Sequence, residues 1–261
     1  MINMNNMTSL QGVICAAGLF EECPVWKNCF INDTTIANCK NIIMTGQHMS
    51  GTIPSTISML TNLEHFAIGG NHYCISGTMP SLKGLTNLMY MDIDQNSISG
   101  TIPKEYAGLN KLTVLDFAFN RFSGTFPGDE LGELSSLQRL YVSGWAPSFG
   151  PKSNMSISGT LPSSSSPFWK LSELTEFGAD GNFISGTVPD EVANLTSLHY
   201  FSINHNRISS AGVGMCISAK HLTEGCKLTQ NDNTWGNCSD CPNCLNNGPC
   251  DDLPYPCCSK G

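Results

Sequence analysis

Apolar residues recur along most of the chain with two spacings in each unit. The stretch Leu109-x-x-Leu112-x-x-Leu115-x-Phe117-x-x-Asn120 combines a spacing of three with a spacing of two. The spacing of two predicts a short β-strand with one buried face, because successive side chains of a strand point to opposite sides. The spacing of three predicts a short helical or 3₁₀ turn before that strand. The same pattern begins again at Leu60, Leu85, Leu134, Leu171 and Leu195, with a degenerate first unit at Cys39.

A pentapeptide of the form Ser-Gly-Thr-apolar-Pro follows every unit of this pattern except the last, which begins at Leu195. Its six copies are Ser50–Pro54, Ser76–Pro80, Ser99–Pro103, Ser123–Pro127, Ser158–Pro162 and Ser185–Pro189. Successive copies lie 23 to 27 residues apart, except for one step of 35 residues. A fixed period of this size predicts a solenoid of about seven coils, because each unit must bury its apolar edge against the next.

The polar residues of the repeat have predictable structural tasks. An Asn follows most strands, and its amide can satisfy backbone groups between coils where water is excluded. The Gly of the pentapeptide permits a tight bend, and the Pro sets the next turn. The Asn positions are 71, 96, 120, 182 and 206, and the Thr positions, which should form a column outside the strand, are 52, 78, 101, 125, 160 and 187.

This combined motif resembles the leucine-rich repeat family, L-x-x-L-x-x-L-x-L-x-x-N, and the continuation Ile98–Pro103 resembles its plant-type subclass. The resemblance implies an α/β solenoid, namely a right-handed horseshoe with a concave parallel β-sheet and disulfide-pinned caps. We therefore expect a Cys-containing cap over residues 1–35, about seven repeats over 36–210 and a Cys-rich cap over 211–261. The long step predicts a loop insertion at about 143–157.

The composition narrows the classes of partner. Charged residues make up only 13% of the chain, and the net charge is −8 with no block of like charge. This balance disfavours nucleic acid and anionic membranes, which select surfaces rich in Lys and Arg. No apolar run approaches the roughly 18 residues that a membrane span needs. Residues 1–10 contain no basic segment, so the sequence shows no clear signal peptide.

Cysteines gather near the two ends of the sequence, which predicts disulfide-pinned caps in an oxidising compartment. The twelve candidates are Cys15, Cys23, Cys29, Cys39, Cys216, Cys226, Cys238, Cys241, Cys244, Cys250, Cys257 and Cys258. Cys74 lies alone within the repeats and is the candidate for an unpaired thiol. The run Cys238-x-x-Cys241-x-x-Cys244 could also bind zinc or an iron–sulfur cluster, but disulfides fit a solenoid cap better. No pairing is assigned.

The remaining cap and surface signals agree with an extracellular location. The segment Cys23–Cys29 looks like the Cys/Trp amino-terminal cap of plant-type repeats, although its spacing differs, and Cys216, Cys226 and Cys238 resemble a Cys-rich carboxy-terminal cap. Sequons for N-glycosylation occur at Asn6, Asn32, Asn154, Asn194 and Asn237.

The outward positions of the strands supply the candidate binding surface, because solenoids commonly bind on their concave sheet. Asp92, Asp94 and Asp116 should crowd together near its middle, either as a solvated acidic face or as a seat for a basic peptide or a cation. Tyrosines flank them, as is typical of interfaces, and also suit sugar recognition. The candidates from the strands are His65, Tyr90, Asp92, Asp94, Asp116, Arg139, Tyr141, Glu176, Asp180, Tyr200 and Asn204.

The insertion after Val142 adds two further candidates, Trp145 and Phe149. A loop rich in Pro and Gly that projects from a rigid scaffold suits recognition. Alternatively, both rings fold back and cover the break in the repeat.

Catalytic motifs are absent from the sequence. His199 and His205 share a coil beside Asn204, where a metal or acid–base role is conceivable, but chance neighbours on a polar face are the preferred interpretation. An open sheet also offers little pocket for perturbing a pKa. We therefore expect a non-enzymatic extracellular or cell-surface module, without cofactor or metal, that binds a protein, a peptide or a glycan. The resemblance implies a receptor ectodomain, an adhesion protein or an inhibitor of a secreted enzyme. The alternative is an ice-binding or cell-wall structural protein that uses the Thr/Ser column.

Overall fold

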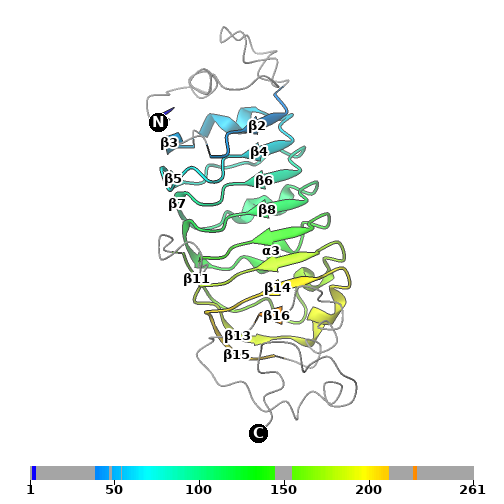
Figure 1. Cartoon of the computed structure of the whole chain (residues 1–261). Helices are drawn as coiled ribbons and strands as arrows, with labels where there is room; N and C mark the ends of the chain where they lie inside the picture. The colour runs from blue at the N-terminus through cyan, green and yellow to red at the C-terminus, as the bar shows by residue number, and fades with distance from the viewer. Residues whose placement is uncertain are drawn as a thin grey trace.

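Successive coils stack into an elongated solenoid with parallel strands along both of its sides (Figure 1). The computed structural model describes residues 39–144 except 47, 48 and 54, residues 155–211, and two short strands at Ile2–Asn3 and Cys226–Lys227. The solenoid predicted from the repeat is thereby confirmed. Apart from Ile2–Asn3, Ala211 and Cys226–Lys227, the predicted caps lie outside the described residues, as do all of the disulfide candidates except Cys39 and Cys226.

The main sheet consists of the strands predicted from the spacing of two. Every neighbouring pair is parallel, and the register joins equivalent positions of the repeat, for example Tyr90 to Val114 and Asp92 to Asp116. In spatial order the strands are β2 (Asn41–Ile43), β4 (His65–Ala67), β6 (Tyr90–Asp92), β8 (Val114–Asp116), β10 (Arg139–Tyr141), β12 (Glu176–Gly178), β14 (Tyr200–Ser202) and β16 (Cys226–Lys227). We call the outward side of this sheet the concave face.

A second parallel sheet, which the sequence did not predict, is built largely from the pentapeptides. The glycines of Ser-Gly-Thr have the positive φ values that suit the expected bend, but most of these residues also lie within strands, which the sequence did not predict. In spatial order the sheet contains β1 (Ile2–Asn3), β3 (Met49–Thr52), β5 (Ile75–Thr78), β7 (Ser97–Gly100), β9 (Arg121–Thr125) and β11 (Ser156–Ser158). The strands β13 (Ser185–Val188) and β15 (Arg207–Ala211) form a further parallel pair, which an isolated bridge from Thr160 to Ser185 links to the preceding coil.

Each residue of Ser-Gly-Thr has a contact that explains this second sheet. The Ser99 hydroxyl donates to the carbonyl of Gly77 on the preceding coil at 3.0 Å, and Ser158 donates to Gly124 at 3.1 Å. The glycines have positive φ values such as +89° at Gly100. A Cβ on Gly100 would lie 3.2 Å from the Thr78 methyl carbon, so the Thr of one coil packs over the Gly of the next. Gly is thus required both for its backbone conformation and for this close approach.

Short helices occupy the outer side of the coils. They lie between the Pro of the pentapeptide and the first Leu of the next unit. The 3₁₀-type turn predicted at Leu-x-x-Leu follows them, because the N–H of the second Leu donates to the carbonyl of the first, as Leu112 does to Leu109 at 2.9 Å. Their first turns follow naturally from a Pro, whose φ suits the start of a helix. The helices are η2 (Ser55–Met59), η3 (Lys104–Gly108), α3 (Gly128–Leu131), η4 (Pro167–Lys170) and η5 (Asp190–Asn194).

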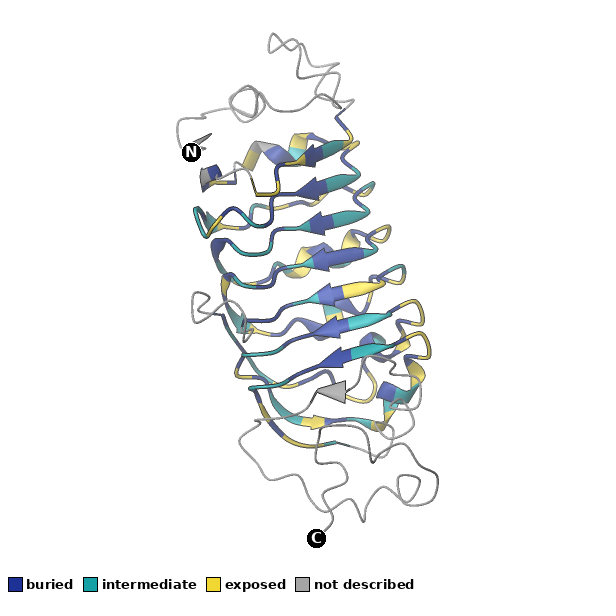
Figure 2. Cartoon of the chain, in the orientation of Figure 1, coloured by how far each residue is buried: buried dark blue, intermediate teal, exposed yellow. Residues whose placement is uncertain are grey.

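The apolar positions of the repeat form one continuous core through the solenoid. Leu112, Leu115 and Phe117 of a single coil are all fully buried, and Leu137, Leu140 and Val142 repeat this arrangement in the next coil. Figure 2 shows buried residues in the main-sheet strands from β2 to β14, and the middle residue of each is buried. Burying each such side chain contributes about 1.5–3 kcal/mol. No coil could retain this contribution without its neighbours.

A ladder of buried Asn side chains closes the gap between coils, as predicted. The Asn120 amide donates to the carbonyls of Ile93, Phe117 and Ala118 at 2.8, 3.1 and 3.2 Å. Its carbonyl oxygen accepts from the Ile98 backbone N–H at 3.0 Å. Because Asn120 is fully buried, these bonds replace those that water would otherwise make.

Replacing one ladder residue should therefore destabilise the solenoid. We expect Asn120→Ala to lower the free energy of unfolding by about 3 kcal/mol or more, because several buried backbone groups would lose their partner. Urea unfolding followed by circular dichroism measures the loss. The exposed Asn110→Ala is the matched control and should change the stability by less than about 0.5 kcal/mol. Equal losses in the two variants would show that the ladder contributes no special stability.

Candidate ligand-binding face

Outward side chains of the main sheet lie in three columns along the concave face, in the register predicted from the sequence. Backbone pairing aligns the first two columns, and hydrogen bonds such as Gln95 N–H to the Ala118 carbonyl extend the alignment to the third. The strand candidates His65, Tyr90, Asp92, Asp94, Asp116, Arg139, Tyr141, Glu176, Asp180, Tyr200 and Asn204 all lie on this face. Trp145 and Phe149 lie outside the described residues.

Three carboxyl groups meet in the middle of the face, and we call Asp92, Asp94 and Asp116 the acidic cluster. One carboxylate oxygen from each lies within 4.8 Å of the others, and each residue is half-buried. The Tyr90 hydroxyl donates to Asp92 at 3.4 Å. The Asp94 backbone N–H also donates to Asp92, at 3.1 Å, and the Gln95 amide donates to Asp94 at 2.8 Å. Carboxylate oxygens at these distances could accept a cationic side chain or a hard divalent cation.

The crowding changes the acidity of two members of the acidic cluster. Burial, followed by the negative charge of Asp92, raises the pKa of Asp94 to about 6. Burial also raises the pKa of Asp116 well above its usual value, although the Ala118 N–H, which donates at 2.8 Å, partly opposes this change. Both effects penalise the charged form of the carboxyl group. A cation that neutralised the cluster would remove much of this penalty.

The acidic cluster is tight because a neighbouring coil has no side chain at one position. A Cβ on Gly69 would lie 2.3 Å from a carboxylate oxygen of Asp94 and 2.6 Å from one of Asp92. Both carboxyl groups therefore occupy the space above Gly69. Gly69 was not among the residues singled out from the sequence, although a Gly at an outward strand position signals a close approach.

Aromatic pairs lie on both sides of the acidic cluster. The ring centres of His65 and Tyr90 are 6.1 Å apart, and those of Tyr141 and Tyr200 are 6.5 Å apart. The second pair also depends on a glycine, because a Cβ on Gly178 would lie 2.9 Å from the Tyr141 ring. The face thus presents an acidic centre between two amphipathic aromatic areas, a combination that suits protein interfaces.

The carboxy-terminal half of the face is held by a polar network around Asp180. The Ser202 hydroxyl and the Asn204 backbone N–H both donate to one oxygen of Asp180 at 2.6 Å. The Asn204 amide in turn donates to the Ser202 hydroxyl at 3.0 Å. Asp180 and Asn204 therefore support each other and offer less unused hydrogen-bonding capacity than the acidic cluster.

The remaining charged candidates on the concave face are Glu176 and Arg139. Glu176 lies 3.7 Å from the His199 ring nitrogen. Arg139 is exposed, and its positive charge acts to lower the pKa of Asp116 against the larger effect of burial. His205 has a pKa lowered by burial, which the charge of Asp180 partly offsets.

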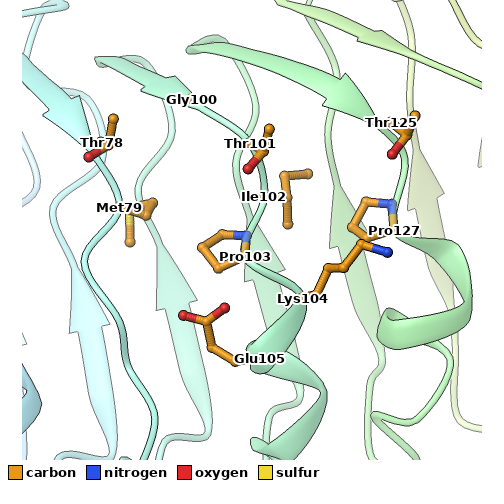
Figure 3. Close-up of a pocket in the computed structure, with 10 residues that line it drawn as sticks. All are labelled: Thr78, Met79, Gly100, Thr101, Ile102, Pro103, Lys104, Glu105, Thr125 and Pro127. Atoms are coloured by element: carbon orange, nitrogen blue, oxygen red, sulfur yellow. The ribbon is translucent and has the colours of Figure 1, made fainter.

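A second surface runs along the Thr column, whose six members are all exposed. Figure 3 shows Thr78, Thr101 and Thr125 in a row on successive coils. Beside them lies a groove of about 660 Å³, and Lys104 at its edge pairs with Glu130. The residues that line the groove are Thr78, Met79, Gly100, Thr101, Ile102, Pro103, Lys104, Glu105, Thr125 and Pro127.

Few of the residues singled out for disulfides or glycans fall in the described part of the chain. Cys39 is buried and its thiol donates to the Asn41 carbonyl at 3.6 Å, whereas Cys74 is half-buried and forms no disulfide with a described residue. Asn194 is exposed at the end of η5. The sequons at Asn6, Asn32, Asn154 and Asn237 lie outside the described residues.

Comparisons with known proteins bear on the fold. No family model matches the sequence, and no curated protein matches it. Among solved structures, the ectodomain of the plant receptor kinase GASSHO1/SCHENGEN3 from Arabidopsis thaliana, in complex with CASPARIAN STRIP INTEGRITY FACTOR 2, matches with a TM-score of 0.66 at 22% identity. That match covers 78% of this chain and 23% of the ectodomain. The chain has the fold of plant-type leucine-rich repeats.

Two further structures with the leucine-rich-repeat fold match over a similar range. The PEPR1–AtPEP1 structure has a TM-score of 0.60 at 22% identity and covers 79% of this chain and 26% of its own. The Arabidopsis receptor kinase HAESA, in complex with the peptide hormone IDA and the co-receptor SERK1, has a TM-score of 0.55 at 22% identity and covers 76% and 34%. This leucine-rich-repeat chain thus spans about a quarter to a third of these proteins.

The leucine-rich-repeat solenoid described here contains short helices only. None of its described helices has the length and the hydropathy that a membrane span requires.

Protonation of the acidic cluster predicts how stability depends on pH. The folded protein holds the Asp94 proton up to about pH 6, whereas an aspartate with the ordinary pKa of 3.8 has lost it. Asp94 therefore stabilises the fold at low pH, and this contribution is lost as the pH rises through about 6. We expect Asp94→Asn to be more stable than the wild type by about 1–2 kcal/mol at pH 7. This value is smaller than the full pKa shift of Asp94 would give, because solvent partly screens the charge of the half-buried carboxyl group.

Urea unfolding at about pH 3 and at pH 7 measures this difference, which should vanish at the lower pH because Asp94 is then protonated in both the folded and the unfolded chain. The exposed Asp129→Asn on α3 removes one negative charge elsewhere and serves as the control. A difference between Asp94→Asn and the wild type that is the same at both pH values would contradict the raised pKa.

Proposed function

We propose that this chain is a non-catalytic extracellular recognition module that binds a protein or peptide ligand on its concave face. The observation that carries the proposal is the acidic cluster, which lies on a rigid sheet between the His65–Tyr90 and Tyr141–Tyr200 pairs. Solved complexes support the choice of ligand class, because HAESA was solved with a peptide hormone and GASSHO1 with CASPARIAN STRIP INTEGRITY FACTOR 2.

Recognition would begin with a cationic group of the ligand at the acidic cluster. An Arg or Lys side chain there would form charge-assisted hydrogen bonds with carboxylates that already lie together. Because Asp92, Asp94 and Gln95 are held by hydrogen bonds in the free protein, little ordering remains to oppose binding. The ligand would also displace protons from the carboxyl groups, so binding should tighten as the pH rises through about 6.

The tyrosine pair would provide the second point of contact. Tyr141 and Tyr200 present ring surface with a polar end, and such residues commonly dominate interface energetics. A ligand that spans from the acidic cluster to this pair would run along the stack of strands and contact several coils. Such an extended contact favours a peptide or a protein segment over a single sugar.

The Thr column supports a second candidate function, ice binding or a structural role in a cell wall. The Thr column continues across the coil that contains the insertion, because Thr125 still packs over Gly159. A Cβ on Gly159 would lie 3.5 Å from Thr125. However, the neighbouring groove hollows the surface beside Thr78, Thr101 and Thr125 (Figure 3). A hollowed surface matches a flat crystal plane less well, so we favour the concave face as the working surface.

A peptide selection tests the proposed function. The immobilised protein would be screened against a display library of random twelve-residue peptides, and enriched peptides would be resynthesised with a fluorescent label. We expect enriched sequences to contain Arg or Lys. Changing Asp92, Asp94 and Asp116 together to Asn should weaken binding at least about tenfold, because the ligand's cation would lose its partners.

The matched control neutralises three exposed acids on the outer side, Glu105→Gln, Asp129→Asn and Glu133→Gln, and should bind as the wild type does. Thermal melts check that both variants fold. If no peptide is enriched, or if the concave and outer variants bind equally well, the proposed surface is wrong.

A separate measurement tests the second candidate. We expect solutions of the protein to show no thermal hysteresis, because the groove interrupts the surface that would contact ice. Nanolitre osmometry measures the gap between melting and freezing points, with Thr101→Val as a comparison. A clear gap that Thr101→Val reduces would favour the Thr column over the concave face.

A further inference from the structure

One coil is two residues longer than its neighbours at the edge of the concave face. Between the ladder Asn and the Ser of the second sheet, most described coils have two intervening residues, as in Asn96–Ser99 and Asn120–Ser123. The coil that runs from Asn71 to Ser76 has four. The extra residues are His72 and Tyr73, and both have left-handed backbones with φ values of +55° and +61°.

This conformation is unfavourable for residues with a side chain. Other coils also have a left-handed residue just before the ladder Asn, for example Gln95 and Phe119, so that position belongs to the repeat. His72 and Tyr73 have no counterpart in those coils. They therefore add strain that the solenoid itself does not require.

The insertion also interrupts the Asn ladder. In other coils, the residue two positions after the ladder Asn donates its backbone N–H to the side-chain oxygen of the ladder Asn in the following coil. Ile98 donates to Asn120 in this way, and Ile184 donates to Asn206, both at 3.0 Å. Tyr73 occupies the equivalent place, but its N–H donates to the Gln95 carbonyl at 3.1 Å. The Asn96 side-chain oxygen is consequently buried with no hydrogen-bond partner among the described residues.

The insertion places Tyr73 beside the acidic cluster, because its N–H donates to the carbonyl of Gln95, whose amide donates to Asp94 at 2.8 Å. Tyr73 is half-buried, and burial followed by the negative charge of Asp94 raises the pKa of its phenol. The Tyr73 carbonyl accepts from the Ser97 hydroxyl at 2.6 Å, which fixes the loop against the next coil. An element that strains the backbone and leaves a buried acceptor unpaired, yet is firmly held, is typical of a functional position.

We propose that the His72–Tyr73 insertion is a recognition element whose Tyr73 ring contacts the bound peptide next to Asp94. This inference rests on the proposed function and adds a residue that the regular columns do not contain. The Tyr73 ring would form the lateral wall of the site, with Tyr90 bordering the same cluster from the sheet. An aromatic ring beside a carboxylate suits a guanidinium or ammonium group, which it can contact with its face.

Deleting His72 and Tyr73 tests both parts of the inference. The deletion leaves Asn71-Cys74-Ile75-Ser76, with the spacing of Asn96–Ser99, and places the Ile75 N–H where Asn96 lacks a donor. We expect the deletion variant to melt at a higher temperature than the wild type. It should also bind the labelled synthetic peptide from the selection at least tenfold more weakly.

Point variants keep the test decisive if the deletion disturbs folding. Tyr73→Ala should weaken binding of the same peptide at least tenfold without lowering the melting temperature, and Tyr73→Phe should largely retain binding. Phe183→Ala, which removes an exposed ring beside Arg207, is the control and should bind normally.

The outcomes separate this inference from the proposed function. If Tyr73→Ala binds as tightly as the wild type while the Asn variants of the acidic cluster do not, the insertion is not a recognition element, although the concave face remains one. A wild-type protein that enriches no peptide overturns both proposals. A deletion variant that melts at a lower temperature overturns the argument from strain.

Discussion

Hydrogen bonding between coils is the constraint on which the rest of this structure depends. A solenoid buries backbone carbonyls and N–H groups wherever its chain turns inward, and water cannot reach them there. The buried Asn120 and Asn206 amides meet that requirement by bonding to their own coil and to the coil before. Because these bonds fix the spacing and the register of the strands, they also decide which outward side chains become neighbours.

The sequence predicted most of the fold for the same reason. The Leu, Ile and Phe positions that repeat with spacings of three and two are the positions that the structure buries, and the Asn residues form the expected ladder. The register of the concave columns followed from aligning the repeats. The second sheet was missed because Ser-Gly-Thr resembles a turn by residue type, and only the contact of Thr78 with Gly100 shows why a Gly is tolerated in a strand there.

The candidate site was predicted less completely, since its geometry depends on glycines, which leave space for the side chains of neighbouring coils. The sequence placed Asp92, Asp94 and Asp116 near one another, but the position of Gly69 allows the first two to converge. Gly178 does the same for Tyr141. The contribution of Tyr73 was also missed, because its coil departs from the repeat and the alignment of columns leaves it out. Deviations from a repeat are therefore as informative about function as the repeat itself.

The Ser hydroxyl bonds of the second sheet and of the β13–β15 pair give the stack of coils a direction. Ser158, Ser185 and Ser209 each donate to a Gly carbonyl one coil earlier. At the last described coil the motif changes to Ser209-Ser210-Ala211, and the register shifts so that Thr187 pairs with Ser210. A side chain now stands where every earlier coil has none. The loss of this glycine ends the packing of Thr over Gly between coils, whereas the main sheet adds one more strand, β16, beside β14.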